Sequence, residues 1–230
     1  MVVVTAAGVV GAMLAQAGGD CRFGTYKPLV SNAPNTTMVA LGDADADGDS
    51  DLVLGAGAAI ELRTNNGDAT FATTGTTMTL AGPLVGLVAG DFRGDGKFEL
   101  AVLSSPVGAS GSQVTWVQRK SGDGSLFSSA TLGLGMRYHQ LVGVDANLDG
   151  RLDLALLSQA RQAVTVISGP SPGSVVTRHY QVGGLPLWLA AGDVTGDALP
   201  DLIIGENTGG ATSAAAAKVL QGLRPGQLLP

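Results

Sequence analysis

The sequence of 230 residues predicts an all-β fold built from repeated units, and three observations support this prediction. Glycine is frequent, with 35 residues, whereas charged residues make up 14% and aromatic residues 4% of the chain, a composition typical of short strands and tight turns. Short apolar runs recur, and an acidic loop separates two of them at four places. These loops lie 48 to 54 residues apart, the spacing of a supersecondary unit repeated in tandem.

The first acidic loop has five aspartates within nine residues, between two apolar runs. Carboxylates about 5 Å apart repel each other by roughly 3 kcal/mol per pair at an effective dielectric near 20, so we expect a cation between them. Calcium suits such a loop because it accepts six to eight oxygen ligands. Loop positions are counted from the first aspartate, so Asp43 is position 1 and Leu54 is position 12. An EF-hand needs an acidic residue at position 12 and helices on both sides of the loop. The expected ligands are the side chains of Asp43, Asp45, Asp47 and Asp51 and the main-chain carbonyl of Asp49.

The nine-residue pattern occurs again at residues 91–99, 145–153 and 193–201, and the four windows contain 14 of the 19 acidic residues. The third loop is complete, although its asparagine supplies a neutral carbonyl and predicts weaker binding. The fourth loop has Ala198 in place of the turn glycine, which costs about 1 kcal/mol if the position requires a positive φ. The expected ligands of the third and fourth loops, with the position-7 residue contributing its carbonyl, are Asp145, Asn147, Asp149, Arg151 and Asp153, and Asp193, Thr195, Asp197, Leu199 and Asp201.

The second loop departs most from the pattern, because Arg93 stands at position 3 and a glutamate at position 9. A guanidinium among these acidic groups can take the place of the ion. We therefore expect a weak or empty calcium site in this loop. Its candidate ligands are Asp91, Asp95, Lys97 through its carbonyl, and Glu99.

Each repeat has the same predicted order of strands. A short apolar strand precedes the acidic loop, and a second apolar strand, of the kind buried on both faces, follows it. An alternating third strand, a turn and a weaker edge strand complete the unit. Three to four strands per repeat indicate the blades of a β-propeller, each packed on its neighbours. The expected single domain, 1–230, has units at 1–31 (partial), 32–81, 82–135, 136–184 and 185–230.

The two ends of the predicted propeller are irregular. The first unit lacks a first strand, and the last stops soon after its third strand, so we expect five visible units of a larger ring, for example a seven-bladed one. Residues 1–17 are apolar like a signal peptide but lack its positively charged start. Because Gly19-Asp20 lies 48 residues before Gly67-Asp68, strands of a partial unit are the preferred interpretation.

The loop pattern Gly-Asp-x-(Asp/Asn)-x-Asp-Gly-x-x-Asp-Leu, followed about 20 residues later by Gly-Asp-x-x-Phe, resembles FG-GAP/VCBS repeats. Such repeats form the β-propeller of integrin α subunits and of many secreted bacterial and fungal proteins. The resemblance extends over nearly the whole chain and implies a calcium-binding propeller. It does not specify a ligand, because the family includes adhesion modules, lectins and non-catalytic parts of secreted enzymes.

The predicted function is that of a non-catalytic, secreted or cell-surface module that binds a protein or glycan, with Ca²⁺ joining the strands of each blade. Extracellular modules bind calcium at about 10⁻⁴ to 10⁻³ M, so the expected location is extracellular, at the cell surface or periplasmic. A lectin, and an accessory propeller domain of a secreted hydrolase or lyase, are the alternatives. Trp116 and Trp188 are expected in the core, so the lectin alternative rests on the resemblance.

Other functions are not indicated by the sequence. The net charge of −6 argues against nucleic acid as a partner, and no apolar segment is long enough for insertion into a membrane. Neither His139 nor His179 lies near a nucleophile motif, and an aspartate bound to calcium is a poor proton shuttle. The tripeptide Arg93-Gly94-Asp95 matches an integrin-binding sequence, but a role within the second acidic loop is preferred.

Overall fold

In the computed structural model, the described residues are 2–4, 9–12, 26–30, 32–33, 35–169, 175–207, 215–223 and 227–229. These residues form antiparallel strands joined by turns and loops, with no helix among them, and so none that could cross a membrane. The first sheet, called here the N-terminal sheet, has three strands: β1 (Val2–Val4), β2 (Val10–Ala12) and β3 (Lys27–Val30).

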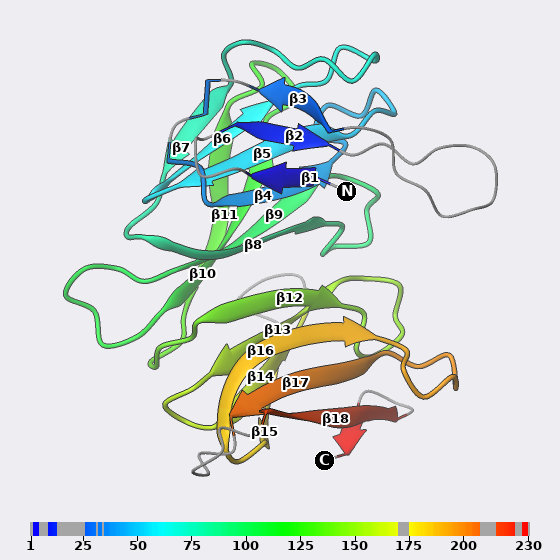
Figure 1. Cartoon of the computed structure of the whole chain (residues 1–230). Helices are drawn as coiled ribbons and strands as arrows, with labels where there is room; N and C mark the ends of the chain where they lie inside the picture. Colours follow the sequence, from blue (N-terminus) through cyan, green and yellow to red (C-terminus); the bar gives the residue numbers. More distant parts are fainter. Residues whose placement is uncertain are drawn as a thin grey trace.

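Four sheets of four strands follow in sequence order and are called blades 1 to 4 (Figure 1). Blades 1 and 2 contain β4 (Met38–Gly42), β5 (Asp51–Ala56), β6 (Ala59–Arg63) and β7 (Thr76–Thr79), and β8 (Leu84–Gly90), β9 (Glu99–Ser104), β10 (Gln113–Arg119) and β11 (Leu126–Gly133). Blades 3 and 4 contain β12 (Gln140–Val144), β13 (Asp153–Ser158), β14 (Ala163–Ser168) and β15 (Val176–Gln181), and β16 (Leu185–Gly192), β17 (Asp201–Asn207), β18 (Ala215–Leu223) and β19 (Gln227–Leu229).

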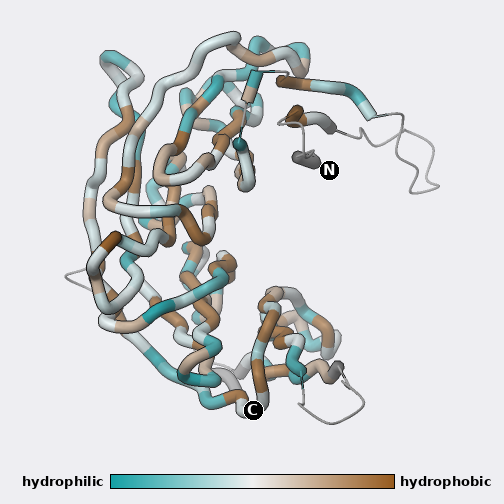
Figure 2. The backbone as a smooth tube through the Cα atoms, turned by 60° about the vertical axis from the view of Figure 1, so that its left-hand side comes forward, coloured by the Kyte–Doolittle hydropathy of each residue, from teal (hydrophilic) through white to brown (hydrophobic). Residues whose placement is uncertain are grey.

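The blades are arranged as a β-propeller, which confirms the predicted fold class. Within each blade the spatial order of the strands follows the sequence, and the first strands of successive blades, β4, β8, β12 and β16, contact one another. Figure 2 shows the result as an open arc, with the N-terminal sheet at one end and blade 4 at the other.

The second strand of a blade explains why apolar runs mark the repeats. In β13 every residue is buried, because the strand has a neighbouring blade on each face. Leu154 and Leu156 pack in the core between blades 2 and 3, whereas Ala155 and Leu157 pack in the core between blades 3 and 4. Successive residues of a strand point to opposite faces, so a strand covered on both sides needs an unbroken apolar run.

The two end sheets differ in completeness. The strands β1, β2 and β3 each begin 49 residues before β5, β6 and β7, which are the second to fourth strands of blade 1. The turn at Gly19-Asp20 lies outside the described residues. The expectation that the last unit stops after its third strand is wrong, because Gln227–Leu229 pairs with Gln221–Leu223 of β18.

The two tryptophans have different surroundings. Trp116 is buried, as predicted, but Trp188 is 70% exposed, so the prediction that it packs in the core is wrong. The register of β16 on β17 shifts between Pro186 and Trp188. Leu189, the residue after Trp188, packs in the core between blades 3 and 4. Trp188 therefore lies on the opposite face of blade 4, which no other described blade covers.

Candidate functional site

The four acidic loops have the same place in their blades, between the first and second strands. They are called loops 1 to 4 and comprise residues 43–51, 91–99, 145–153 and 193–201. In every loop the position-9 acidic residue is also the first residue of the second strand and is at most 2% exposed. These buried residues are Asp51, Glu99, Asp153 and Asp201.

Repeated hydrogen bonds hold the backbone of all four loops. The position-9 carboxylate accepts from the position-2 N–H, with donors Ala44, Phe92, Ala146 and Val194 at 2.8 to 3.1 Å. The position-1 aspartate accepts from the position-6 N–H at 2.8 to 3.1 Å, and the position-5 aspartate accepts from the position-7 N–H at 2.9 to 3.1 Å. Sequence reasoning missed this second role of the predicted metal ligands, although aspartate in turns commonly accepts from nearby backbone N–H groups.

Each loop also contains two residues in the left-handed backbone region. At position 6 these are Gly48, Gly96, Gly150 and Ala198, and the alanine has a φ of 63°. The sequence-based prediction that Ala198 occupies a position suited to glycine is therefore confirmed, because its φ is positive. Position 4 has the same requirement, which sequence reasoning did not detect because alanine, glycine and leucine all occur there: Ala46, Gly94, Leu148 and Gly196.

Ala198→Gly is expected to stabilise the protein by about 0.5–1 kcal/mol, since glycine adopts this φ without steric cost but is more flexible in the unfolded chain. Equilibrium urea denaturation measures the effect. Ala81→Gly is the control, because Ala81 is exposed and has no positive φ. A lower unfolding midpoint for Ala198→Gly would contradict the prediction.

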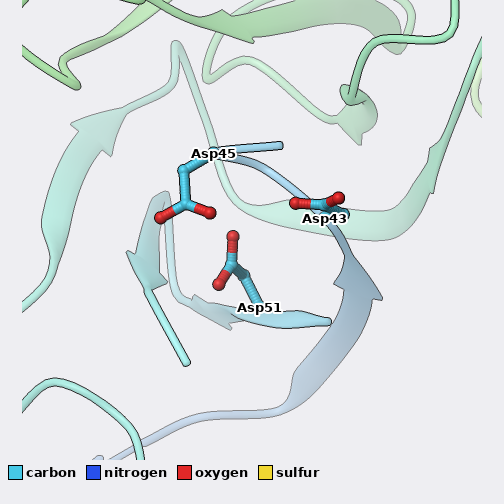
Figure 3. A group of neighbouring side chains, drawn as sticks. All are labelled: Asp43, Asp45 and Asp51. Carbon is cyan, nitrogen blue, oxygen red and sulfur yellow. The ribbon is translucent and has the colours of Figure 1, made fainter. Parts of the chain in front are cut away.

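Loop 1 brings three acidic side chains together. Carboxylate oxygens of Asp43, Asp45 and Asp51 lie within 4.8 Å of one another (Figure 3). Asp45 Oδ1 is buried and has no hydrogen-bond partner. Burial and the nearby charges of Asp51, Asp47 and Asp43 raise the pKa of Asp45, although Arg119 opposes this shift. A converging set of hard oxygen donors with an unsatisfied buried oxygen fits a calcium ion. Asp47 is not part of this group, and its Oδ1 accepts from the Asp49 N–H.

Loops 3 and 4 are organised differently. In the described part of the chain, only loop 1 gathers three acidic groups so closely. In loop 3, Asn147 Nδ2 donates a hydrogen bond to Asp149 Oδ2 at 3.1 Å. Burial raises the pKa of Asp153 to about 6, although a hydrogen bond from Ser168 acts to lower it. In loop 4, Thr195 donates its N–H to Asp201. Calcium in these two loops therefore stays a prediction.

Asp201 has its charge stabilised by the backbone. Burial acts to raise its pKa, but hydrogen bonds from the N–H groups of Gly222, Val194 and Thr195 bring the pKa below its ordinary value. The Gly222 N–H lies 2.8 Å from Asp201 Oδ1, and this residue comes from β18, the third strand of blade 4. Asp201, the first residue of β17, thus also connects loop 4 to β18.

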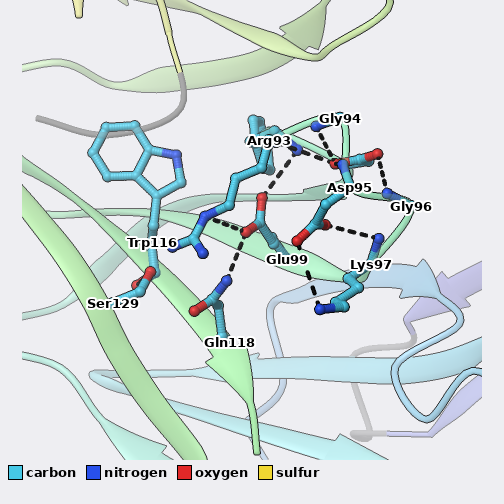
Figure 4. A network of polar contacts seen from close by, with 11 residues as sticks. Arg93, Gly94, Asp95, Gly96, Lys97, Glu99, Trp116, Gln118 and Ser129 are labelled. Atoms are coloured by element: carbon cyan, nitrogen blue, oxygen red, sulfur yellow. Dashed lines mark hydrogen bonds and ion pairs between the residues drawn. The ribbon is translucent and has the colours of Figure 1, made fainter. Parts of the chain in front are cut away.

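Loop 2 contains a cation of its own. Arg93 Nε lies 2.8 Å from Glu99 Oε1, which also accepts from Gln118 Nε2 at 2.7 Å (Figure 4). Burial raises the pKa of Glu99, while the hydrogen bond from Gln118 and the charge of Arg93 act in the opposite direction. Asp91 accepts from four successive backbone N–H groups, at residues 93–96. Arg93 is thus engaged inside the loop, and weak calcium binding by loop 2 stays a prediction.

The family comparison agrees with this repeated architecture. Residues 43–102, which include loops 1 and 2, match the family model of the FG-GAP-like repeat. The fold therefore defines the chain as a β-propeller, in which residues 43–102 are similar to the FG-GAP-like repeat. A comparison with curated protein sequences finds no match.

Solved structures with a similar fold include two longer proteins. Sqt1 of Saccharomyces cerevisiae has a TM-score of 0.57 and 13% identity, over 97% of this chain and 56% of that chain. A lectin of Agrocybe aegerita that recognises non-reducing terminal N-acetylglucosamine has a TM-score of 0.53 and 16% identity, over 95% of this chain and 62% of that chain. These similarities show the fold, and the chain spans 56% and 62% of the length of the two proteins.

Proposed function

We propose that this chain is a non-catalytic binding module of the extracellular space, the cell surface or the periplasm, and that calcium stabilises its loop 1. The observation that carries the proposal is the convergence of Asp43, Asp45 and Asp51, with one buried oxygen left without a partner. Sites of this kind in extracellular modules bind calcium at about 10⁻⁴ to 10⁻³ M, so they fill outside the cell.

Calcium in loop 1 would neutralise carboxylates that otherwise repel one another. Asp43 follows β4 directly and Asp51 begins β5, so the shared ion would join the first two strands of blade 1. Asp51 is also anchored by the N–H groups of Ala44 and Asn65, at 2.8 Å each. Among the three expected ligands, Asp45 is the one with a buried oxygen, Oδ1, that has no hydrogen-bond partner.

A binding role is preferred over catalysis because both histidines take part in structural hydrogen bonds. His139 Nδ1 accepts from the Gln159 N–H at 3.2 Å, and burial lowers the pKa of this histidine. His179 Nδ1 lies 2.9 Å from Thr165 Oγ1, which in turn contacts the buried hydroxyl of Tyr138. The Thr165 hydroxyl beside His179 is buried, with Thr165 only 1% exposed, so a substrate cannot reach it as a nucleophile.

A lectin is the second candidate for the function, and the fold similarity to the Agrocybe aegerita lectin supports it. The similarity concerns the fold and leaves the ligand open. A glycan array probed in calcium and in chelator distinguishes this candidate from a module that binds proteins. Retention of a glycan only in calcium would support the lectin.

The calcium site is tested by equilibrium dialysis against about 10 mM calcium, roughly ten times the weakest dissociation constant of such modules, so that loop 1 is nearly saturated. Asp45→Asn is expected to bind about one calcium ion fewer per chain than the wild type, because it removes a negative charge from loop 1 and replaces a carboxylate ligand with a more weakly binding neutral carbonyl. The matched control is Asp95→Asn in loop 2, where Arg93 already supplies the positive charge. Equal calcium content in the Asp45→Asn variant and the wild type would refute the proposal.

A further inference from the structure

A cavity of about 430 Å³ lies beside loop 1, between it, loop 2 and the turn that follows β10. Asp43 and Asp45 line its acidic side, and Arg119 and Lys120 line it from the end of β10. The ring of Phe98 contributes an apolar surface. The cavity therefore combines both charges with an aromatic ring, which is the composition of a site for a polar organic ligand.

Two of the cations around the cavity form no close ion pair. Arg93 and Lys97 are paired with acidic residues of loop 2, at 2.8 and 3.8 Å. By contrast, neither Arg119 nor Lys120 forms an ion pair within 4.0 Å in the described part of the chain. Arg119 Nε is buried and has no hydrogen-bond partner. No acidic side chain of the described residues therefore competes at close range for these two cations.

Arg119 and Phe98 each lie close to a glycine. A Cβ atom at Gly124 would lie 3.0 Å from Arg119 Nη2, so the guanidinium rests close to the backbone of the turn. A Cβ atom at Gly42 would lie 2.7 Å from Phe98 Cδ2 and Cε2, so the phenyl ring packs closely on β4. A side chain at either glycine would therefore crowd one of these two lining residues.

The charge balance of the cavity depends on loop 1. If calcium binds the carboxylates of Asp43 and Asp45, their negative charge is neutralised and Arg119 and Lys120 dominate the cavity. A carboxylate is a good partner for this pair, because guanidinium and carboxylate groups form strong charge-assisted hydrogen bonds. A sugar ring carrying that carboxylate would place its C–H face on Phe98 and its hydroxyl groups near the polar wall.

We propose that this cavity binds a saccharide that carries a carboxylate, with Arg119 and Lys120 holding the carboxylate and Phe98 packing against the sugar ring. The inference rests on the proposed binding function and names its ligand class. It also assigns a position to the site, at the junction of blades 1 and 2.

Titration calorimetry in about 10 mM calcium, which is expected to nearly saturate loop 1, tests the proposal with two pairs of probes. They are 3′-sialyllactose with lactose, and cellobiouronic acid with cellobiose. At least one acidic saccharide is expected to bind about tenfold more tightly than its neutral partner, which corresponds to one charge-assisted contact. Arg119→Gln is expected to lower this affinity by about tenfold or more, and Lys120→Gln to lower it less because Lys120 is more exposed. Arg161→Gln is the control, since Arg161 is exposed on the turn between β13 and β14.

Three results would overturn the proposal. These are no binding of either acidic saccharide to the wild type, equal binding of acidic and neutral partners, and unchanged affinity of a folded Arg119→Gln variant. The calcium dialysis of Asp45→Asn is independent of these titrations. Failure of the saccharide site together with loss of one calcium ion in Asp45→Asn would leave the calcium-stabilised binding module standing, whereas unchanged calcium content would refute that module itself.

Discussion

Replacing Arg93 with aspartate is expected to make loop 2 depend on calcium. Arg93 occupies position 3, where loop 1 has Asp45, and its guanidinium pairs with Glu99, whose side chain is 2% exposed. Without this cation Glu99 keeps only the hydrogen bonds from Gln118 and the Phe92 N–H. Breaking a buried ion pair costs about 3–5 kcal/mol, and we expect about 2 kcal/mol here because the Arg93 side chain is 37% exposed.

Urea denaturation of Arg93→Asp in chelator and in calcium measures both halves of this prediction. In chelator the variant should unfold at lower urea than the wild type, and calcium should restore most of the difference. Equilibrium dialysis should show one additional calcium ion per chain. Arg161→Asp provides the same charge change on an exposed turn and should have neither effect. A variant that is as stable as the wild type in chelator would show that Arg93 does not neutralise Glu99, and a destabilised variant without a calcium response would show that loop 2 cannot hold the ion.

Leu156→Ala is expected to destabilise the protein by about 3–4 kcal/mol, within the range measured for truncation of buried leucines. Leu156 lies on β13, is 0% exposed, and packs in the core between blades 2 and 3 with Leu103 and Trp116. Because the strand is covered on both faces, the neighbouring blades cannot close the cavity without moving their own side chains. The loss therefore includes both the transfer free energy and the cavity term.

Equilibrium urea unfolding, followed by circular dichroism, measures this loss. The control is Leu185→Ala on β16, where the leucine is 43% exposed and the expected cost is below about 1 kcal/mol. Equal losses for the two variants would contradict the assigned core. Since each blade contacts mainly its neighbours, a shallower transition for Leu156→Ala would show that blades 2 and 3 separate before the rest unfolds.

The acidic loops and apolar runs were sufficient to predict the fold. An acidic residue at position 9 marks the end of the loop, and an apolar run directly after it, such as Leu154 to Leu157, indicates a strand that is covered on both faces. The same unit recurs at 48 to 54 residues, and only stacked blades can bury such strands repeatedly. The positive φ at Ala198 was also foreseen, because the other loops have glycine at that position.

Other features depended on contacts between elements that are distant in sequence. The exposure of Trp188 follows from its place on the outer face of blade 4, since an apolar residue in a strand does not by itself reveal whether another blade covers it. Likewise, the fourth strand β19 follows from its pairing with β18, and the left-handed residue at position 4 follows from the backbone path of the loop.

The sequence by itself determined that this chain is an all-β propeller of repeated blades and that its acidic residues concentrate in four equivalent loops. The tertiary structure decided how those residues are used. It brings Asp45 near Arg119, closes a cavity with Phe98, and pairs Arg93 with Glu99. The physical reason is that spacing along the chain sets which strand and face a residue occupies, whereas the meeting of charges depends on how adjacent blades pack and in which register their strands pair.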